Sequence, residues 1–420
     1  MANNLSSNIT RPLAKIFLEA FESSRVVTKT VNTQLLSGKF NPSTGTKVDF
    51  KRPHDYNTIR TSGGDISGSA KSNIIAGKAT GTVQPYFTAA TEYENIQQAL
   101  ELDQLDQILE PMARRLVTDL ELDLAKFMRI NTGLNYGARG TAVDAWSDVA
   151  GAGAMMDSVG VPMSDNKYYL MNPFTTTSLA SAQSGLNAAD GLVRTAFEKA
   201  QIASNFGGMK ALTSNALSSY TSGSTTDRLG DLKTAPDATY VTAKDTMQQT
   251  MVIETLGTGT IEAGDQIQVA GVNRLNIATR QLILDATGAA VPWTGTVLSV
   301  VTIAGNEATV VVSGAAIFEA NGQYNNVDAA PAAGAVVTIL GAAGAVYQPN
   351  LFYTEQAFGL GTVKLPKLYS TDTVATTSDG MSIRVSKYSD GDANTQKIRF
   401  DLLPAYAVFN PNFAGQGYGV

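Results

Sequence analysis

The chain has 420 residues, of which 43% are hydrophobic and 16% are charged. This length indicates about two or three folding units, and so little charge is typical of a protein whose surface largely meets other protein. Cysteine is absent and His54 is the only histidine. The sequence therefore excludes disulfides, thiolate nucleophiles and metal sites built on several histidines, and we expect neither a metal nor a cofactor.

The formal net charge of −6 is distributed unevenly. Residues up to Arg60 contain nine Lys and Arg against four Asp and Glu, a net charge of +5, which leaves −11 for the remainder. A basic segment is attracted to nucleic acid or to an acidic partner, whereas the acidic remainder argues against a general nucleic-acid-binding surface. A solvated tail explains the same charge equally well.

No arrangement of residues typical of an enzyme is present. His54 lies in the polar stretch PHD, which reads as a turn and is a poor place for the base of a Ser-His-Asp triad. A Walker-type phosphate loop is absent, and the stretch GTGTIE at 257–262 lacks the next glycine that a dinucleotide fold requires. The carboxylates between residues 103 and 123 fall on the polar side of a helix, where nothing indicates a closed pocket.

The sequence also predicts no contact with a membrane. Two uncharged stretches, 286–305 and 329–353, are long enough to span a bilayer, but proline and glycine interrupt both, which favours buried strands and loops. Residues 1–10 lack the charged and then apolar pattern of a signal peptide. We therefore expect a soluble protein.

The segment Gln97–Ile130 is the one long amphipathic helix candidate. Its apolar residues recur at helical spacing on one face, whereas Glu110 with Arg114 and Asp123 with Lys126 can pair along the polar face. Pro111 suits a first helical turn better than an interior, so we expect a short helix up to Leu109 and a long one from Pro111 onward. The apolar positions are Leu105, Ile108, Leu109, Met112, Ala113, Leu116, Leu120, Leu124, Phe127 and Met128.

The chain before this helix has little to bury. Residues Pro12–Phe21 predict a short amphipathic helix, and Arg25–Thr33 predict a strand. From Thr46 to Pro85 short strands such as KVDFKR alternate with glycines, and large apolar residues are few, so this segment cannot form a core of its own. It is either a flexible surface hairpin or an extended arm that becomes stable only against another subunit.

After the long helix, the pattern predicts an α/β module. Asp144–Val159, Phe174–Gln183 and Asp190–Gln201 are predicted helices, and Lys167–Met171 is a predicted strand that ends at an Asn-Pro helix start. From about Ser222 the composition changes to short β-type runs separated by turn residues, which suggests a small closed barrel inserted into the module. Its six candidate strands are 250–254, 266–272, 280–285, 296–303, 308–312 and 335–340, with the edges at 218–227 and 329–345.

Beyond the barrel, Asn350–Leu360 predicts a short helix or turn, followed by an extended stretch at 364–368. Met381–Lys387 and Gln396–Leu403 predict two strands joined by the turn SDGDAN, and Tyr406–Phe413 predicts a last strand. The turn resembles the start of a calcium loop, but it lacks the glycine at the sixth place and the closing glutamate, which favours a plain hairpin. The fold class is therefore α+β.

This order of elements resembles a known family, the major capsid (coat) proteins of tailed double-stranded DNA bacteriophages with the HK97-like fold. The similarity is to the P22 coat protein-like branch, which carries an inserted β-barrel domain. The stretches that carry it are LVTDLELDLAKFM at 116–128, AGDQIQVAGV at 263–272, NLFYTEQAF with KLP at 350–366, SIRV with RFD at 382–401, and VFNP at 408–411.

The resemblance implies a structural shell protein and no enzyme. It implies hexamers and pentamers of an icosahedral capsid, a scaffolding protein that directs a precursor shell, a portal protein, expansion on maturation, and non-specific contact with packaged dsDNA. The protein is then a virion component that assembles in the host cytoplasm. The implied domains are an N-terminal arm at 1–45, an extended β-hairpin loop (E-loop) at 46–90, a peripheral domain with a spine helix at 91–135 and 381–420, an axial domain at 136–221 and 346–380, and the inserted barrel at 222–345.

Two groups of residues are candidate sites under this resemblance. The first is expected at contacts between subunits and comprises Lys51, Arg52, Arg60, Gly63, Gly64, Arg114 and Arg115. The second is expected to face the interior or the scaffold and comprises Arg11, Lys15, Arg25 and Lys29. The apolar face of the spine helix is expected to pack on the closing strands, with Leu116 and Leu120 buried.

Two other classes of protein remain as alternatives. An encapsulin compartment shares the fold but lacks an inserted barrel. A secreted β-rich adhesin or carbohydrate-binding protein would account for the Ser, Thr and Gly content, although the missing signal peptide and the long helix weigh against it.

Overall fold

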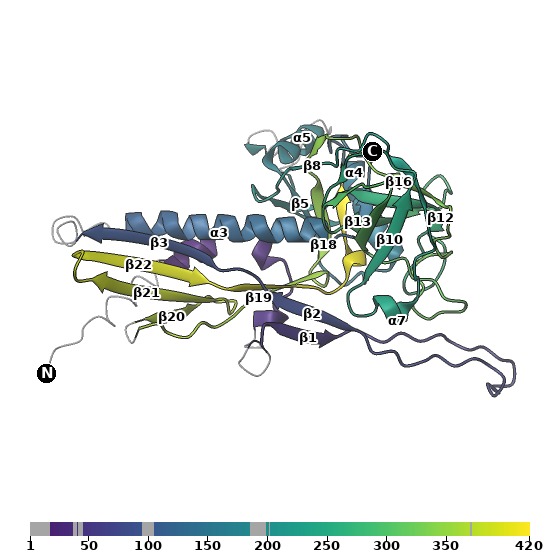
Figure 1. Ribbon diagram of the computed structural model, residues 1–420, viewed down its shortest axis with the longest axis horizontal. Coiled ribbons are helices and arrows are strands. Elements are labelled where there is room, and N and C mark those ends of the chain that lie inside the picture. Colours follow the sequence, from purple (N-terminus) through teal and green to yellow (C-terminus); the bar gives the residue numbers. More distant parts are fainter. Residues whose placement is uncertain are drawn as a thin grey trace. The chain divides into compact units, whose positions relative to one another are not determined.

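A computed structural model describes residues 17–36, 40, 45–94, 105–184, 199–200, 202–369 and 372–420. The chain forms two compact units. The first comprises Met1–Asp49, Thr80–Ala125 and Phe358–Ala407, and the second comprises Phe50–Ala79, Lys126–Ala357 and Val408–Val420. Figure 1 labels their elements. The mixed α+β class is confirmed, whereas the predicted helix at 190–201 lies almost entirely outside the described residues.

The long helix α3 (Leu105–Ile130) buries most of the predicted stripe from Ala113 onward, whereas the side chains of residues 105–109 lie outside the described part. Leu116 is 3% exposed, and Leu120 and Leu124 are completely buried, so the spacing of four residues does place them on one covered face. The predicted interruption is wrong, because Pro111 lies inside a continuous helix. A proline removes one backbone donor, and the buried face on its C-terminal side outweighs that local loss. Residues 97–104 of the prediction lie outside the described part.

In the first unit, α3 runs along an antiparallel sheet (Figure 1). Its strand order is β20-β21-β22-β3, and the hairpin predicted between the closing strands is confirmed. The carboxylate of Asp390 accepts the backbone N–H of Asp392 at 3.1 Å, so these residues shape the turn. The strands are β20 (Thr373–Thr376), β21 (Ser382–Asp390), β22 (Thr395–Leu402) and β3 (Phe87–Glu94).

A second sheet has the order β1-β2-β23-β19. The helix or turn expected at 350–360 is wrong, since that stretch forms the two strands β18 (Asn350–Thr354) and β19 on either side of a short turn. Every residue of both strands is buried, so the run shows no alternation that would identify a strand. The four strands of this second sheet are β1 (Lys47–Lys51), β2 (Lys78–Val83), β23 (Pro404–Val408) and β19 (Phe358–Thr362), whereas β18 belongs to a third sheet.

The N-terminal segment is part of the first unit and does not form the expected strand. Residues 17–24 are helical, in agreement with the end of the predicted helix, whereas 12–16 lie outside the described residues. The strand predicted at 25–33 is wrong, because the short 3-10 helices η1 (Val27–Lys29) and η2 (Gln34–Leu36) take its place.

A buried carboxylate explains why residues 26–28 form a helical turn and not a strand. Glu121 of α3 is 4% exposed, and its Oε1 accepts the backbone N–H of Val26, of Val27 at 2.8 Å and of Thr28 at 3.4 Å. Successive N–H groups that converge on one acceptor require a helical turn, and this outweighs the β preference of the Val and Thr side chains.

The second unit contains a six-stranded sheet with the order β4-β24-β18-β5-β7-β6. The helices α4 (Trp146–Val159) and α5 (Pro173–Ser184) and the strand β5 (Lys167–Met171) confirm three predicted elements. Val149 and Met156 of α4 pack with Tyr169 of β5 in one core. The remaining strands are β4 (Leu134–Tyr136), β24 (Ala414–Gly417), β7 (Met209–Thr213) and β6 (Asn205–Phe206).

The predicted six-stranded barrel is present, in the order β10-β15-β13-β12-β16-β9. In β10 and along most of β15, buried residues alternate with more exposed ones, and Trp293, Ile267 and Val310 are among the residues that fill the barrel interior. The strands are β9 (Leu229–Leu232), β10 (Gln248–Glu254), β12 (Gln266–Asn273), β13 (Pro292–Val297), β15 (Ala308–Ser313) and β16 (Val336–Ile339).

Two of its predicted strands are wrong. Residues 280–285 make only isolated bridges, and β9 supplies the sixth strand instead. Its sequence LGDL was missed because a glycine and an aspartate are unusual in a strand. The predicted strand 296–303 is divided between the end of β13 and the short β14 (Val301–Thr302), which pairs with β11 (Thr260–Ile261) outside the barrel.

The burial of Glu121 predicts a specific pH dependence. Burial raises the pKa of its carboxyl above the ordinary value of 4.5, although the backbone donors oppose this. The folded state therefore favours the protonated form, and this contribution to stability is lost as pH rises above about 4.5 through the raised pKa. The free energy of unfolding of wild type minus that of Glu121→Gln should fall between pH 4.5 and pH 8 in urea titrations. The exposed Glu19→Gln serves as control, and a difference that rises with pH contradicts this assignment.

Candidate functional site

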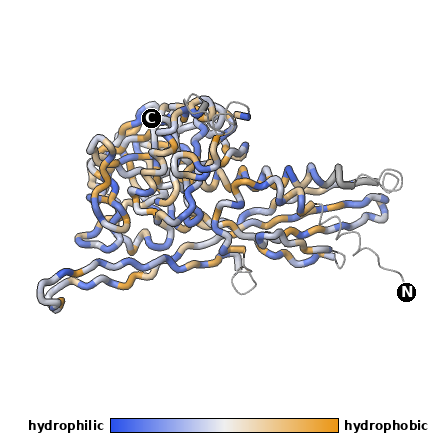
Figure 2. The backbone as a smooth tube through the Cα atoms, turned by 180° about the vertical axis from the view of Figure 1, so that it is seen from behind, coloured by the Kyte–Doolittle hydropathy of each residue, from blue (hydrophilic) through white to orange (hydrophobic). Residues whose placement is uncertain are grey.

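Residues 52–77, between β1 and β2, form a long extended segment that we call the arm. Figure 1 shows its two halves side by side, and Figure 2 shows only isolated hydrophobic residues along it. The halves are joined by the N–H of Arg52 to the carbonyl of Gly77 at 2.9 Å and by the N–H of Asn57 to Ser72 Oγ at 2.8 Å. Even a regular two-stranded hairpin without a core is barely stable in water, and the arm has neither strand pairing nor a core, so it depends on contacts with other parts of the protein or with another molecule.

The candidate contact residues on the arm occupy two environments. Arg60, Gly63 and Gly64 are exposed, and a Cβ atom added at either glycine would meet no other atom within 4 Å. Gly64 has φ +72°, which favours glycine in this turn. Lys51 is exposed at the end of β1, whereas Arg52 is half-buried and donates to the carbonyls of Phe409 and Lys78. The guanidinium of Arg52 is thus partly used within its own subunit.

Arg114 and Arg115 are exposed on α3 and are paired along the helix. Arg114 contacts Glu110, as predicted, and Arg115 contacts Asp119 at 3.0 Å. Asp123, which was expected to pair with Lys126, accepts a hydrogen bond from the Tyr406 hydroxyl at 3.0 Å. Exposed pairs of this kind contribute less than about 1 kcal/mol and can exchange for contacts with a partner.

The second group of candidates is divided by the structure. Lys29 is exposed, whereas Arg11 and Lys15 lie outside the described residues. Arg25 is wrong as an interior-facing or scaffold-facing residue, because its side chain is 1% exposed and forms an ion pair with Asp379 at 2.7 Å. It holds the N-terminal segment to the first unit instead.

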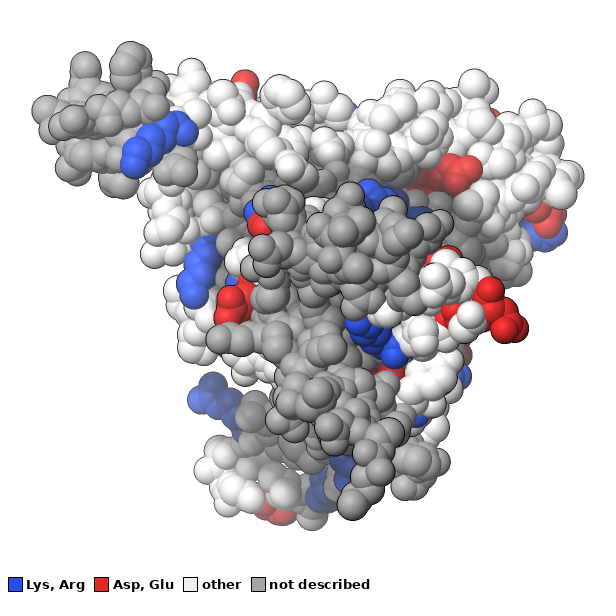
Figure 3. Space-filling view, turned by 90° about the vertical axis from the view of Figure 1, so that its left-hand side faces the viewer, with Lys and Arg blue, Asp and Glu red and all other residues white. Residues whose placement is uncertain are grey.

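Little charge is visible among the described residues on the face drawn in Figure 3. In Figure 3 most described side chains of the viewed face are neither acidic nor basic, and the charged ones are scattered. No helix in the described ranges is both long and apolar enough to cross a bilayer. Among the described residues no group of three or more His, Asp or Glu side chains could hold a metal ion.

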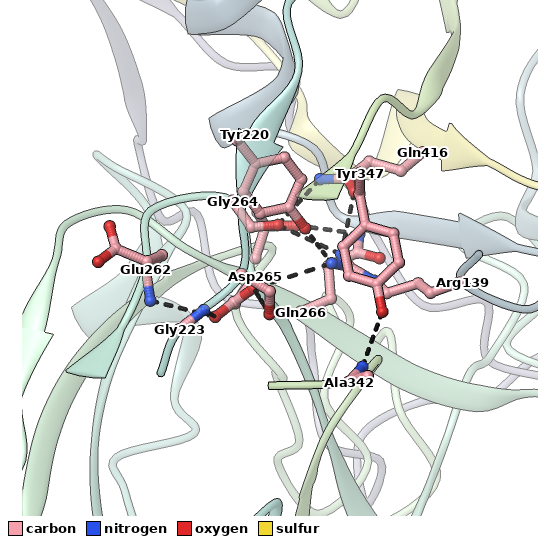
Figure 4. A network of polar contacts seen from close by, with 12 residues as sticks. Arg139, Tyr220, Gly223, Glu262, Gly264, Asp265, Gln266, Ala342, Tyr347 and Gln416 are labelled. Atoms are coloured by element: carbon pink, nitrogen blue, oxygen red, sulfur yellow. Dashed lines mark hydrogen bonds and ion pairs between the residues drawn. The ribbon is translucent and has the colours of Figure 1, made fainter. Parts of the chain in front are cut away.

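Sequence reasoning missed a buried polar network beside the barrel (Figure 4). At its centre is Asp265, whose carboxylate is fully buried. One oxygen accepts the Ser222 hydroxyl at 2.7 Å, and the other accepts the N–H of Gly223 at 2.9 Å and of Glu262 at 3.1 Å. Asp265 therefore fixes the chain where it leaves β8 (Tyr220–Thr221) for the barrel.

Two arginines flank this carboxylate. Arg139 and Arg228 each approach one oxygen of Asp265 at 3.9 Å. Arg139 also donates to the hydroxyl of Tyr220, and Arg228 donates to the carbonyl of Ala342 at 2.7 Å, where the chain returns from the barrel. Burial alone would lower the pKa of Arg139, but the nearby tyrosines and Asp265 raise it, so the cation is maintained.

Aromatic rings complete the network. The guanidinium of Arg129 lies 4.1 Å from the ring centroid of Tyr220, and that of Arg139 lies within 6 Å of the rings of Tyr220, Tyr347 and Tyr418. Such contacts compensate in part for the burial of the charges. The only sequence signal was the turn Gly264-Asp265, because Arg139 is distant in the chain and belongs to no local pattern.

Comparison with known proteins gives a consistent result. Residues 1–419 match the family model described as P22 coat protein - gene protein 5. The chain is 47% identical over 424 residues to the major capsid protein of Acyrthosiphon pisum secondary endosymbiont phage 1, and the match covers 100% of both chains.

Solved structures give weaker similarities. The capsid of the cyanophage P-SCSP1u matches with a TM-score of 0.45 and 13% identity over 93% of this chain and 86% of that one. Mycobacterium phage Che8 matches with a TM-score of 0.46 and 11% identity over 94% and 89%.

Asp265→Asn tests the network around the barrel. The amide would turn an N–H₂ group toward the backbone N–H groups of Gly223 and Glu262 or toward Ser222, and it would leave the two arginines without a counter-charge. We expect a loss of about 3–5 kcal/mol of unfolding free energy in urea titrations. Asp227→Asn, at an exposed position nearby, should change it by less than about 0.5 kcal/mol. Equal effects of the two substitutions would contradict the assignment.

Proposed function

The chain belongs to the P22 coat protein family, and from this premise we propose how it builds a shell. It is a major capsid protein that forms a phage capsid, a structural protein and not an enzyme. This assignment replaces the alternative of a secreted adhesin. The finer proposal is that the chain forms hexamers and pentamers of an icosahedral shell, by way of a scaffold-directed precursor that expands around dsDNA.

The arm is the observation that carries this proposal. It has exposed apolar residues at Tyr56, Ile66 and Ile74 and no core of its own. A segment of this kind is retained in a folded protein when another molecule covers it. In a shell, the other molecule is a second copy of the chain, and Arg60, Gly63 and Gly64 near the tip are the proposed contact residues, together with Lys51 and Arg52 at its base and Arg114 and Arg115 on α3.

Weak contacts suit this assembly. Each subunit presents polar and small apolar groups that are individually worth little, yet a closed shell multiplies them. Wrong contacts can then dissociate before closure. The divisions 1–45, 46–90, 91–135 with 381–420, 136–221 with 346–380, and 222–345 are proposed as the domains of this subunit.

The basic N-terminal region is proposed to face the interior. Arg11, Lys15 and the exposed Lys29 are the cations available for an acidic scaffolding protein or for packaged DNA. A portal protein at one vertex and assembly in the host cytoplasm complete the proposal. Support for these partners comes from the charge asymmetry and from membership of the family.

Electron microscopy of the purified chain with the scaffolding protein of the same phage tests the proposal directly. Closed shells of uniform size that form only with the scaffold are the expected result. Subunits that stay monomeric under all such conditions would overturn it.

The tip of the arm can be tested with a matched pair of glycines. Gly64 and Gly305 both have positive φ, +72° and +62°, and open space around them, but only Gly64 lies in the arm. A valine at either position costs about 1–2 kcal/mol of backbone strain. Gly64→Val, alone or with Gly63→Val, should lower the yield of closed shells severalfold, whereas Gly305→Val should lower only the melting temperature. Equal shell yields from Gly64→Val and Gly305→Val would argue against a role of the tip.

Removal of residues 1–16 tests the interior role of the basic region. This deletion takes away Arg11 and Lys15 but keeps the buried Phe17, Phe21 and Arg25 of the first unit. Sedimentation should show a folded subunit whose scaffold-dependent assembly is reduced and less sensitive to salt. Unchanged assembly by the truncated chain would remove these residues from the proposal.

A further inference from the structure

The base of the arm is attached to the inserted barrel segment, and this attachment suggests a role for the barrel in assembly. Asp55 forms an ion pair with Arg280. The side-chain amide of Asn57 donates to the carbonyl of Asn321 at 2.7 Å, so the outgoing half of the arm is held by two polar contacts.

The returning half of the arm is held by the loop 321–325, which also contacts Asn57, and by residues 240–245 and Ile317. The side-chain amide of Gln323 donates to the carbonyl of Asn73 at 2.7 Å. Ile75 packs against the small apolar cluster that contains Tyr240 and Ile317. The backbone N–H of Lys78 donates to Asp245 Oδ1 at 3.2 Å.

The loop that makes these contacts is itself firmly placed. Arg280 donates to the carbonyls of Gln323 and of Asn325, the latter at 2.6 Å. The ring of Tyr324 stacks on that of Tyr240, with centroids 3.6 Å apart and an interplanar angle of 12°. Gln323 and Asn325 are each 8% exposed. One guanidinium therefore joins the loop to the arm while it also fixes the shape of the loop.

The packing is closest at Gly77. A Cβ atom there would lie 2.7 Å from the Lys244 carbonyl oxygen and 2.9 Å from the Tyr240 hydroxyl. By contrast, a Cβ atom at Gly68, farther out on the arm, would meet nothing within 4 Å. The base of the arm is thus fitted to the barrel segment, whereas the tip is not.

We propose that Tyr240, Arg280 and residues 321–325 act as a clasp that fixes the direction of the arm of the same subunit before a second copy binds. A long loop without a core loses conformational freedom when it binds, and an arm already held at its base loses less. The inserted barrel thereby presents the tip to the next subunit in one orientation. The effect on assembly rests on the proposed shell function, but the clasp itself does not.

The matched variants Gly77→Ala and Gly68→Ala test this inference. Each adds one methyl group to the arm, but only the first meets backbone atoms. Arg280→Met is a second way to open the clasp, without a steric clash. Limited trypsin digestion of the unassembled subunit is the first measurement, since Arg60 and Lys71 lie beyond the clasp and Lys78 lies at its base.

In wild type and in Gly68→Ala, we expect rapid cleavage after Arg60 or Lys71 and slow cleavage after Lys78. Gly77→Ala and Arg280→Met should raise the rate after Lys78 about tenfold, because cleavage follows the population of the open form. Thermal melting of each variant shows that the subunit is still folded.

The second measurement is the rate of scaffold-dependent shell formation by light scattering. The two clasp variants should assemble severalfold more slowly than Gly68→Ala. Unchanged cleavage after Lys78 in both variants would overturn the clasp. Faster cleavage with a wild-type assembly rate would overturn its role in presenting the arm. If wild type itself formed no shells, the proposed function would fail, while the cleavage rates would still decide whether the clasp exists.

Discussion

The second unit depends most on the contacts that surround the buried carboxylate of Asp265. An ion removed from water is tolerated only when hydrogen bonds and opposite charges replace its hydration. Here a hydroxyl, two backbone N–H groups and two arginines surround it. The chain can adopt this arrangement only when β8, the start of β12 and the returning segment at Ala342 are all in place. The network therefore selects one arrangement of the inserted barrel within its unit, at a considerable cost in desolvation.

The arm follows the opposite principle. It has almost no buried side chains, and its contacts at the base are polar or made by single residues such as Ile75. Such contacts leave the tip without internal support. The arm therefore has little internal support of its own, in contrast to the tightly specified region around Asp265.

The sequence predicted those parts of the fold that depend on regular spacing. The stripe of α3, the closing hairpin and most barrel strands follow from periodicity, and the arm follows from its glycines and its lack of large apolar residues. Failures occurred where tertiary contacts override local preference. Glu121 turns a β-rich segment into 3-10 helix, complete burial hides the strands β18 and β19, and the glycine and aspartate of β9 disguise a barrel strand. The polar network could not be predicted from the sequence because its members are distant in the chain. A single arginine such as Arg139 belongs to no local sequence pattern that would mark it as part of a network.

The pairing of β8 with β17 (Val346–Tyr347) has a consequence for how this chain could have arisen. Paired strands lie about 4.8 Å apart, so the chain leaves for the barrel and returns from it through neighbouring positions. A two-residue turn would bridge that gap as well as the whole barrel does. Insertion or deletion of the whole barrel segment in one genetic event would therefore leave the pairing register of β8 and β17 unchanged.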